Sequence, residues 1–139
     1  MPIPPVGLRH RESVKVDQSL TVPEVSPAFR HFRDMPPVFA TAFMVGFVEE
    51  TCVAALERYL EPGQRTVGTR VDLSHDAATP IGMTVSVEVE LIEVDGRRLR
   101  FKVEARDDKD VIGKGHHERF IIDQAKFMAR LEAKARGER

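Results

Sequence analysis

A single glutamate raises the first question about this sequence. The stretch FATAFMVGFVEETC, residues 39–52, is apolar for about two and a half turns of potential helix and then meets Glu49 and Glu50. Glu50 can point to water, whereas Glu49 lies among apolar neighbours, and a buried carboxylate costs free energy unless it is paired. Held there, Glu49 would suit acid–base chemistry. Alternatively, it faces a subunit interface and bonds to an arginine or to a backbone group.

A histidine ends the first strand-like run after this stretch. Residues 66–75 alternate Val67, Val71 and Leu73 with polar residues. Continuing the alternation points His75 to the apolar side of the strand, where a helix must lie. There it is either a hydrogen-bonded core residue or, with an acid on the facing helix, the imidazole of a His–carboxylate pair.

Thr41 stands at or just before the start of the helix that carries Glu49. Its hydroxyl is either an ordinary N-cap or a group beside free helix N–H donors, where a developing oxyanion would be stabilised. Thr41 and Glu49 are eight residues apart, which is about 12 Å along one helix. The two side chains can meet only if Thr41 lies on a loop that bends back, or if two subunits share the site.

Other reactive residue types are weaker candidates. Cys52 is mid-helix, away from the helix N-terminus that would lower the pKa of a thiol, which favours core packing. His116 and His117 are neighbours on a strand and point to opposite faces. No Cys or His cluster has zinc spacing, so no metal site is expected. Arg119 shares a strand face with His117, where it could bind an anion or face solvent.

The elements that must position these groups follow from the patterning. A helix is predicted from about residue 40 to residue 60; it is apolar nearly all round, which is typical of a buried helix. Residues 1–10 predict an irregular arm, and residues 23–37, with four prolines and two phenylalanines, a lid-like loop. Strands are predicted at residues 13–22, 66–75, 84–94, 98–106 and 111–122, and a polar C-terminal helix at residues 124–137.

One central helix determines the fold class. A single helix cannot cover a whole flat sheet, and this one is apolar on too many sides to need only one sheet face. The sheet must therefore curl around it. The expected class is α+β, an antiparallel five-stranded sheet curled around a long central helix, which is the hotdog fold, in one domain over residues 1–139. Hotdog domains usually pair through the sheet, so a homodimer is expected.

The bulk composition excludes several kinds of protein. Lys plus Arg is 21 and Asp plus Glu is 22, so the formal net charge of −1 gives no general attraction to nucleic acid or to an anionic membrane. No run approaches the roughly 20 apolar residues of a membrane span, and the N-terminus has no signal core. One cysteine allows no intrachain disulfide. A cytoplasmic domain that binds neither nucleic acid nor membrane is expected.

Three stretches together resemble the fluoroacetyl-CoA thioesterase family of hotdog proteins: VFATAFMVGFVEETCV, YLEPGQRTVGTRVDLSHDAATPIGMTV and EVDGRRLRFKVEARDDKDVIGKGHHERFII. The likeness runs from about residue 14 to residue 130. It implies hydrolysis of a short acyl-CoA thioester. The family's catalytic threonine, glutamate and histidine fall on Thr41, Glu49 and His75, and its substrate-contacting glycine and arginine fall on Gly68 and Arg119.

The same resemblance implies a lid with two gating phenylalanines. The first gate falls on Phe32 and the second on Met35, a flexible side chain without a ring edge, which bears on fluoro-selectivity more than on hydrolysis. Phe39 would complete the apolar lining around the acyl group. No cofactor is implied beyond the coenzyme A of the substrate. Two other functions stay open: a hotdog enoyl-CoA hydratase, whose Asp–His motif is not found here, and a non-catalytic module that binds acyl-CoA or another small ligand.

Overall fold

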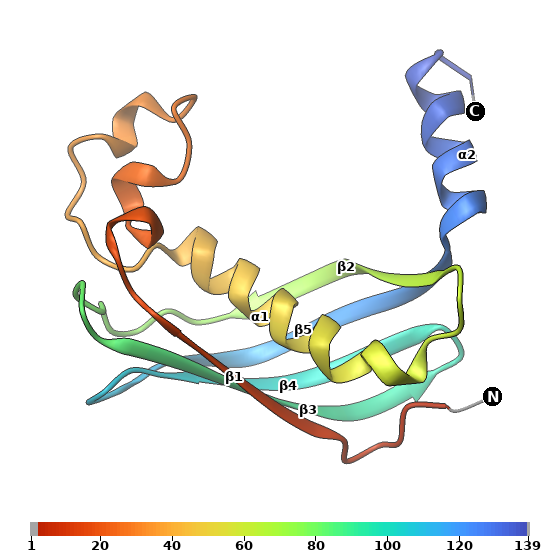
Figure 1. Cartoon of the computed structure of the whole chain (residues 1–139), viewed down its shortest axis with the longest axis horizontal. Coiled ribbons are helices and arrows are strands. Elements are labelled where there is room, and N and C mark those ends of the chain that lie inside the picture. The colour runs from red at the N-terminus through yellow and green to blue at the C-terminus, as the bar shows by residue number, and fades with distance from the viewer. Residues whose placement is uncertain (1–2, 139) are drawn as a thin grey trace.

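The computed structural model describes residues 3–138, so the first two residues of the predicted arm and the last residue of the chain lie outside it. Five antiparallel strands form one sheet in the order β1-β3-β4-β5-β2. They are β1 (Arg9–Lys15), β2 (Gln64–Leu73), β3 (Thr84–Asp95), β4 (Arg98–Arg106) and β5 (Val111–Asp123). The sheet curls around helix α1 (Thr41–Leu56), and α2 (Gln124–Ala135) follows β5 (Figure 1). The α+β hotdog arrangement is confirmed.

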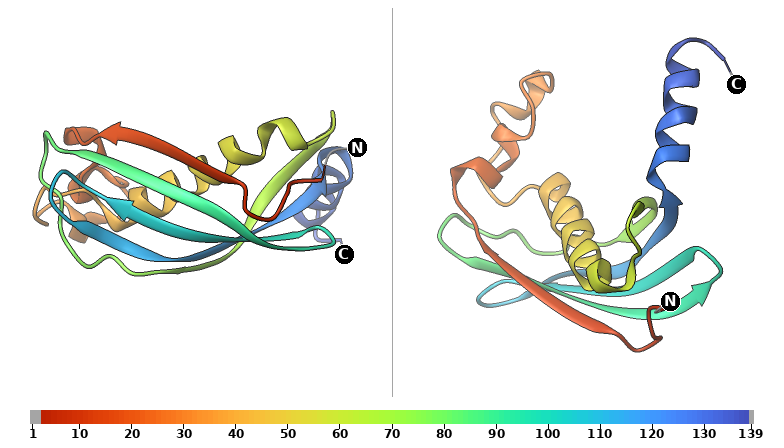
Figure 2. Two further views of the ribbon diagram at one scale, coloured as in Figure 1. Left: turned by 90° about the horizontal axis from the view of Figure 1, so that it is seen from below. Right: turned by 45° about the vertical axis from the view of Figure 1, so that its right-hand side comes forward.

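The core lies between α1 and the concave face of the sheet, as the two turned views show (Figure 2). Strands β3 and β4 alternate buried apolar with polar side chains, as predicted. Their inward residues pack against an apolar stripe of α1 that recurs every fourth residue, and each fully buried Val, Leu, Phe or Met side chain contributes about 1.5–3 kcal/mol. The side chains are Val85, Val87, Val89, Leu91, Leu99, Phe101, Val103 and Ala105 from the strands and Met44, Val48, Cys52 and Leu56 from α1.

The opposite face of α1 is open. Val53 on that face is 42% exposed, and Gly46 and Glu50 are also exposed. The prediction of a helix buried nearly all round is therefore wrong for the single chain, because the sheet covers only one side of it. No helix within residues 3–138 is long and apolar enough to cross a membrane.

The N-terminal segment differs from the prediction. Strand β1 begins at Arg9, inside the predicted arm, and ends at Lys15, so most of the predicted strand at residues 13–22 is wrong. The reason is Asp17, whose side chain accepts a hydrogen bond from the backbone N–H of Ser19 at 2.9 Å and starts a 3-10 turn. Three such turns, Gln18–Leu20, Val22–Glu24 and Arg30–Phe32, shape the chain up to α1. This segment rises from the N-terminal end of α1 on the helix side of the sheet (Figure 1).

Edge strand β2 contains a bulge between Gly68 and Arg70. Before the bulge, Thr66 and Gly68 face α1, since Thr66 Oγ1 bonds to an arginine under the helix and a Cβ on Gly68 would meet Glu49. After the bulge, Val71 pairs with the inward-facing His117. The single alternation predicted for residues 66–75 is therefore wrong in its first half, because the extra residue of a bulge moves the following side chains to the other face.

Two glycines of β5 let the end of β2 and the segment after it lie against β5. A Cβ on Gly113 would collide with the carbonyl oxygen of Ser74, and one on Gly115 with that of Asp72. The missing side chains of these two glycines thus allow backbone to approach β5 closely. Ser74 N donates to Lys114 O at 2.9 Å and Asp76 N donates to Ile112 O at 2.6 Å. The chain around His75 is therefore held down on β5.

Gly113→Ala should destabilise the fold by about 1–3 kcal/mol, because the methyl group meets backbone that cannot move without breaking these hydrogen bonds. Chemical denaturation measures the loss. Gly46→Ala is the matched control: apart from its chain neighbours and the backbone of α1 itself, no atom lies within 4 Å of its Cβ position, and alanine is the better helix former by about 1 kcal/mol. Equal stability of the Gly113→Ala and wild-type proteins would contradict this account.

Candidate active site

A hydroxyl–imidazole pair lies at the N-terminus of α1. Thr41 Oγ1 is 2.7 Å from Nδ1 of His75, which follows two residues after the end of β2. Ala40 is the N-cap of α1 and Thr41 its first residue. An N-cap role for the Thr41 hydroxyl is therefore wrong, because the hydroxyl pairs with the imidazole instead. Thr41 is exposed, so a ligand can reach this pair.

The environment of His75 favours the neutral ring. The edge of Phe39 meets the ring with 6.4 Å between centroids and an interplanar angle of 76°. Burial lowers the pKa of His75 below its usual value, and the nearby Asp76 charge opposes this more weakly. Nε2 is buried and has no hydrogen-bond partner within the described residues. A neutral imidazole next to a hydroxyl can accept a proton near pH 7.

Three free backbone donors lie in the first turn of α1, at the same end of the helix as the Thr41–His75 pair. The N–H groups of Thr41, Ala42 and Phe43 have no acceptor in the part of the chain that the structure describes, and no side chain caps the helix. The first N–H groups of any helix lack intrahelical partners and carry the positive end of its dipole. Together with the Thr41 hydroxyl they can hold a carbonyl oxygen that becomes negative.

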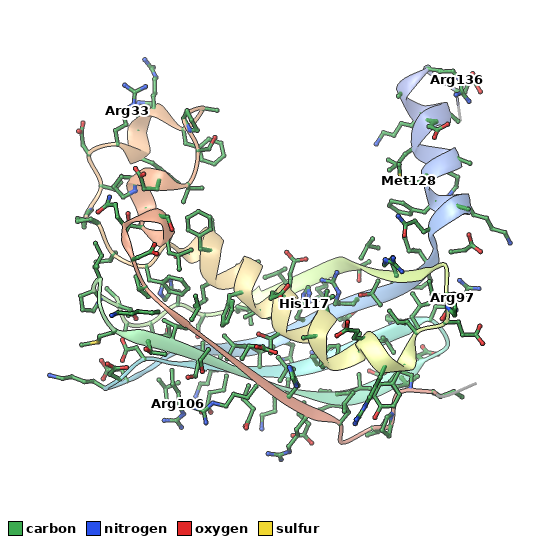
Figure 3. The ribbon with its side chains drawn as sticks, viewed as in Figure 1. Arg33, Arg97, Arg106, His117, Met128 and Arg136 are labelled. Atoms are coloured by element: carbon green, nitrogen blue, oxygen red, sulfur yellow. The ribbon has the colours of Figure 1, made fainter. Side chains whose placement is uncertain are left out.

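A second cluster lies about two turns further along α1. The side chain of Arg119 on β5 is 6% exposed, and its Nη1 donates to Glu49 Oε1 at 3.0 Å. Its other hydrogen bonds go to Thr66 Oγ1 at 2.9 Å, Thr66 O at 3.0 Å and His117 Nε2 at 3.1 Å. Figure 3 shows His117 at the level of the middle of α1. Glu49 therefore bonds to an arginine, which is one of the alternatives that the sequence left open for it. The alternative in which Arg119 faces solvent is wrong.

Gly68 makes room for this cluster. A Cβ there would lie 2.7 Å from Glu49 Oε1, 3.2 Å from His117 Cε1 and 3.3 Å from Arg119 Nη1. Any side chain at position 68 would therefore push Glu49 away from Arg119. The glycine and arginine singled out by the resemblance thus lie together, beside Glu49.

The two clusters do not meet within one chain. Thr41 belongs to α1, so it and Glu49 are separated by about 12 Å of helix. The arrangement in which Thr41 lies on a loop that bends back is therefore wrong. Glu49 bonds to Arg119 and not to His75, and its side chain is 42% exposed.

The predicted lid residues have different surroundings. Phe32 packs edge-on against Phe29 with 5.4 Å between ring centroids, and Met35 is 45% exposed. Phe39 is 1% exposed and belongs to the core, where it supports His75. Cys52 is fully buried and its pKa is raised to about 12, mainly by burial, which confirms its packing role.

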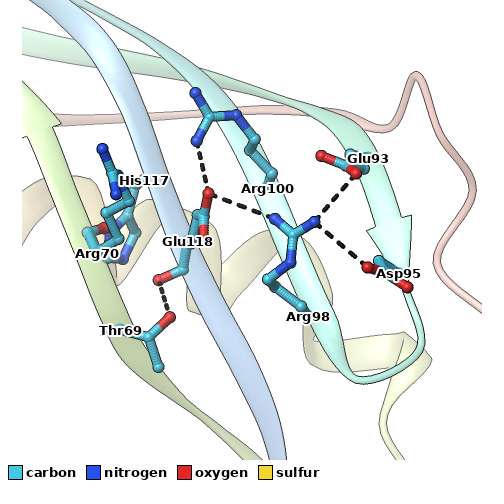
Figure 4. Close-up of polar contacts among 8 residues, drawn as sticks. All are labelled: Thr69, Arg70, Glu93, Asp95, Arg98, Arg100, His117 and Glu118. Atoms are coloured by element: carbon cyan, nitrogen blue, oxygen red, sulfur yellow. Dashed lines mark hydrogen bonds and ion pairs between the residues drawn. The ribbon is translucent and has the colours of Figure 1, made fainter.

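Sequence reasoning missed His117 as part of the site. The available signal was its place on the inward face of β5, two residues before Arg119. On the outer face of the sheet, arginines of β4 are matched by carboxylates. Glu118 bonds to Arg100 at 2.6 Å and to Arg98 at 3.4 Å, and Arg98 also reaches carboxylates of β3 (Figure 4).

Comparisons with known proteins give first the class and then the family. A thioesterase-superfamily protein from Thermus thermophilus superposes with a TM-score of 0.84 at 30% identity, over 99% of this chain and all of that one. With its curled sheet and central helix, the chain is a thioester hydrolase of the hotdog fold. The profile of the family described as fluoroacetyl-CoA-specific thioesterase matches residues 16–125.

A curated fluoroacetyl-CoA thioesterase from Streptantibioticus cattleyicolor is 46% identical over 129 residues, 93% of each chain. A solved structure of a fluoroacetyl-CoA thioesterase superposes with a TM-score of 0.91 at 45% identity, over 94% of this chain and 96% of that one. The chain belongs to the fluoroacetyl-CoA-specific thioesterase family.

Asp76→Asn should lower the pKa of His75 further, because the Asp76 charge favours the imidazolium. An NMR titration of the His75 ring measures the shift, with Asp95→Asn at the β3–β4 turn as the control. A group whose folded pKa is depressed binds protons more readily when unfolded, so its stability contribution is lost as pH falls below about 6.5. In the Asp76→Asn protein, the loss of folding stability should therefore continue to a lower pH than in wild type. An unchanged or raised pKa would contradict the assignment.

Proposed function

We propose that this protein is a homodimer that hydrolyses a short-chain acyl-CoA thioester to the free acid and coenzyme A. Thr41 and His75 of one protomer form each site together with the partner subunit's Glu49. The 2.7 Å contact between the Thr41 hydroxyl and His75 Nδ1, at the open N-terminus of α1, carries the proposal. The family supports the substrate class, because the relatives are named fluoroacetyl-CoA thioesterases. Their solved structures include a threonine variant in complex with acetyl-CoA.

A thioesterase must stabilise the oxyanion, supply an attacking group and move a proton. The carbonyl oxygen of the substrate binds the free N–H groups at the start of α1 and the Thr41 hydroxyl. The partner's Glu49 supplies the carboxylate, by one of two routes. If Glu49 activates a water molecule, neutral His75 accepts the proton that the water releases on attack and gives it to the leaving sulfur. If the carboxylate attacks the carbonyl carbon directly, a mixed anhydride forms as the thiolate of coenzyme A leaves, and water activated by neutral His75 then hydrolyses the anhydride to the free acid and regenerates Glu49. The reaction uses no metal and no cofactor other than the coenzyme A of the substrate.

Exposed apolar surface supports the dimer. Val71 on edge strand β2 is 49% exposed, and Val53 on the open face of α1 is 42% exposed. Met128 and Leu131 of α2 are 43% and 44% exposed, and no residue of α2 is buried. Both α2 and the segment before α1 rise on the helix side of the sheet (Figure 1). Such surfaces mark interfaces, and a second copy would cover them while bringing its Glu49 toward Thr41.

The proposed acyl group is small, in keeping with the substrate for which the relatives are named, fluoroacetyl-CoA. Phe32 and Met35 lie on the segment that rises beside Thr41, where closure over the substrate would exclude water. Met35 replaces a ring with a flexible chain, so selectivity for a fluorinated over a plain acetyl group should be weaker than with two aromatic gates. Arg119 is buried and bonded to Glu49, so the phosphates of coenzyme A must bind other, exposed lysine or arginine side chains. The proposed compartment is the cytoplasm.

A mixing experiment tests the shared site. Glu49→Gln and Thr41→Ala proteins should each lose turnover by orders of magnitude while staying folded, as should His75→Ala. When the first two are unfolded and refolded together, heterodimers carry one intact site each, and about a quarter of wild-type activity should return. A protein with both substitutions in one chain is the control. If the mixture stays as inactive as its parents, the site is not shared between subunits.

A thioester panel tests the reaction. Free coenzyme A should be released from acetyl-, propionyl- and fluoroacetyl-CoA, measured with a thiol reagent. Hydration of crotonyl-CoA without thiol release would identify a hydratase, and tight binding of esters without any reaction would identify a binding module. A preference for fluoroacetyl-CoA over acetyl-CoA below about tenfold would show that the selectivity in the relatives' name does not extend to this chain.

A further inference from the structure

His117 takes no part in the proposed reaction, yet it is one of the most buried polar side chains. It is 1% exposed, on β5 between Phe101 of β4 and Val71 of β2. Its ring nitrogens both have partners, and the two partners have opposite hydrogen-bonding character. A buried imidazole with this arrangement is held in one chemical form.

The partners determine that form. Nδ1 lies 2.7 Å from the carbonyl oxygen of Arg70, which only accepts, so Nδ1 carries the hydrogen. Nε2 lies 3.1 Å from Arg119 Nη1, which only donates, so Nε2 presents its lone pair. The neutral Nδ1–H tautomer is the one form of His117 that satisfies both neighbours.

Arg119 Nη1 has two hydrogens, and each has an acceptor. One points to His117 Nε2 and the other to Glu49 Oε1, at 3.1 Å and 3.0 Å. Thr66 holds the other edge of the guanidinium through Oγ1 and its carbonyl oxygen. The guanidinium is planar, so an acceptor at His117 decides where the second Nη1 hydrogen points.

We propose that His117 is a positioning residue: through Nε2 it holds the Arg119 guanidinium so that Nη1 donates to Glu49. This places the carboxylate that the thioesterase site uses. The catalytic meaning rests on the proposed function, whereas the positioning of Glu49 is a property of the fold.

Only the neutral ring can do this, because a proton on Nε2 would face the Nη1 hydrogens with a second positive charge. Burial lowers the pKa of His117, and the Arg119 charge acts in the same direction. The Arg70 carbonyl, Glu49 and Glu118 oppose them. The charged groups facing the ring are Glu49 from α1 and Arg119 from β5, with Glu118 on the outer face of β5; β4 and β2 present Phe101 and Val71.

Two amide variants separate positioning from packing. His117→Gln can place its amide oxygen where Nε2 lies and keep an acceptor for Arg119. His117→Asn can place its amide nitrogen where Nδ1 lies and keep the donor to Arg70, but it offers Arg119 nothing. His117→Asn should lose about 10–100-fold in kcat with a smaller change in KM, as expected for a misplaced reacting group. His117→Gln should stay within about threefold of wild type, because the anchor of Arg119 is kept.

A spectroscopic measurement that does not depend on enzyme activity completes the test. In ¹⁵N spectra of the full-length protein, separate Nη1 and Nη2 signals of Arg119 report hindered rotation of the guanidinium. They should be separate in wild type and His117→Gln and averaged in His117→Asn. Equal kcat values for the two variants, or Arg119 spectra that do not differ between them, overturn the proposal. If wild-type protein releases no coenzyme A from any thioester, the proposed function fails, while the Arg119 spectra still decide the positioning role.

Discussion

A guanidinium buried under α1 imposes the strictest requirement on this interior. Taking the charge of Arg119 out of water costs free energy unless carboxylate and hydrogen-bond partners surround it. Glu49 supplies the opposite charge, Thr66 supplies two acceptors, and His117 supplies a third in its neutral form. Gly68 supplies the space. The acid in this apolar helix is thus paired within its own chain, because Glu49 bonds to Arg119 of the sheet.

Helix α1 fixes the distance between the two clusters. It has no proline and an uninterrupted buried stripe, so the distance between Thr41 and Glu49 cannot shorten. The proposed chemistry needs a hydroxyl, an imidazole and a carboxylate at one carbonyl group. A rigid helix that separates them within each chain is compatible with that chemistry only if a second helix, related by symmetry, supplies the missing group.

Regular alternation made much of the fold predictable. Strands β3 and β4 and the stripe on α1 follow from the spacing of apolar residues, because one face of each is buried. The turn at Asp17 was missed because a short side chain competes with the backbone locally. His117 and Thr66 were missed as members of the cluster around Arg119, because the cluster is assembled from three elements. Their meeting depends on a bulge that apolar periodicity does not show.

The bulge divides β2 into two parts, and the alternation of side chains between the two faces of the sheet is shifted by one residue from the first part to the second. The part before the bulge carries Thr66 and Gly68 to the charged cluster at the middle of α1, and the part after it leads to His75 at the N-terminus of α1. Substitutions along this strand can alter either cluster separately. An insertion or deletion between positions 68 and 75 cannot, because it would rotate one half out of phase with the other. Across a lineage, the length of this segment should therefore be more constant than its composition.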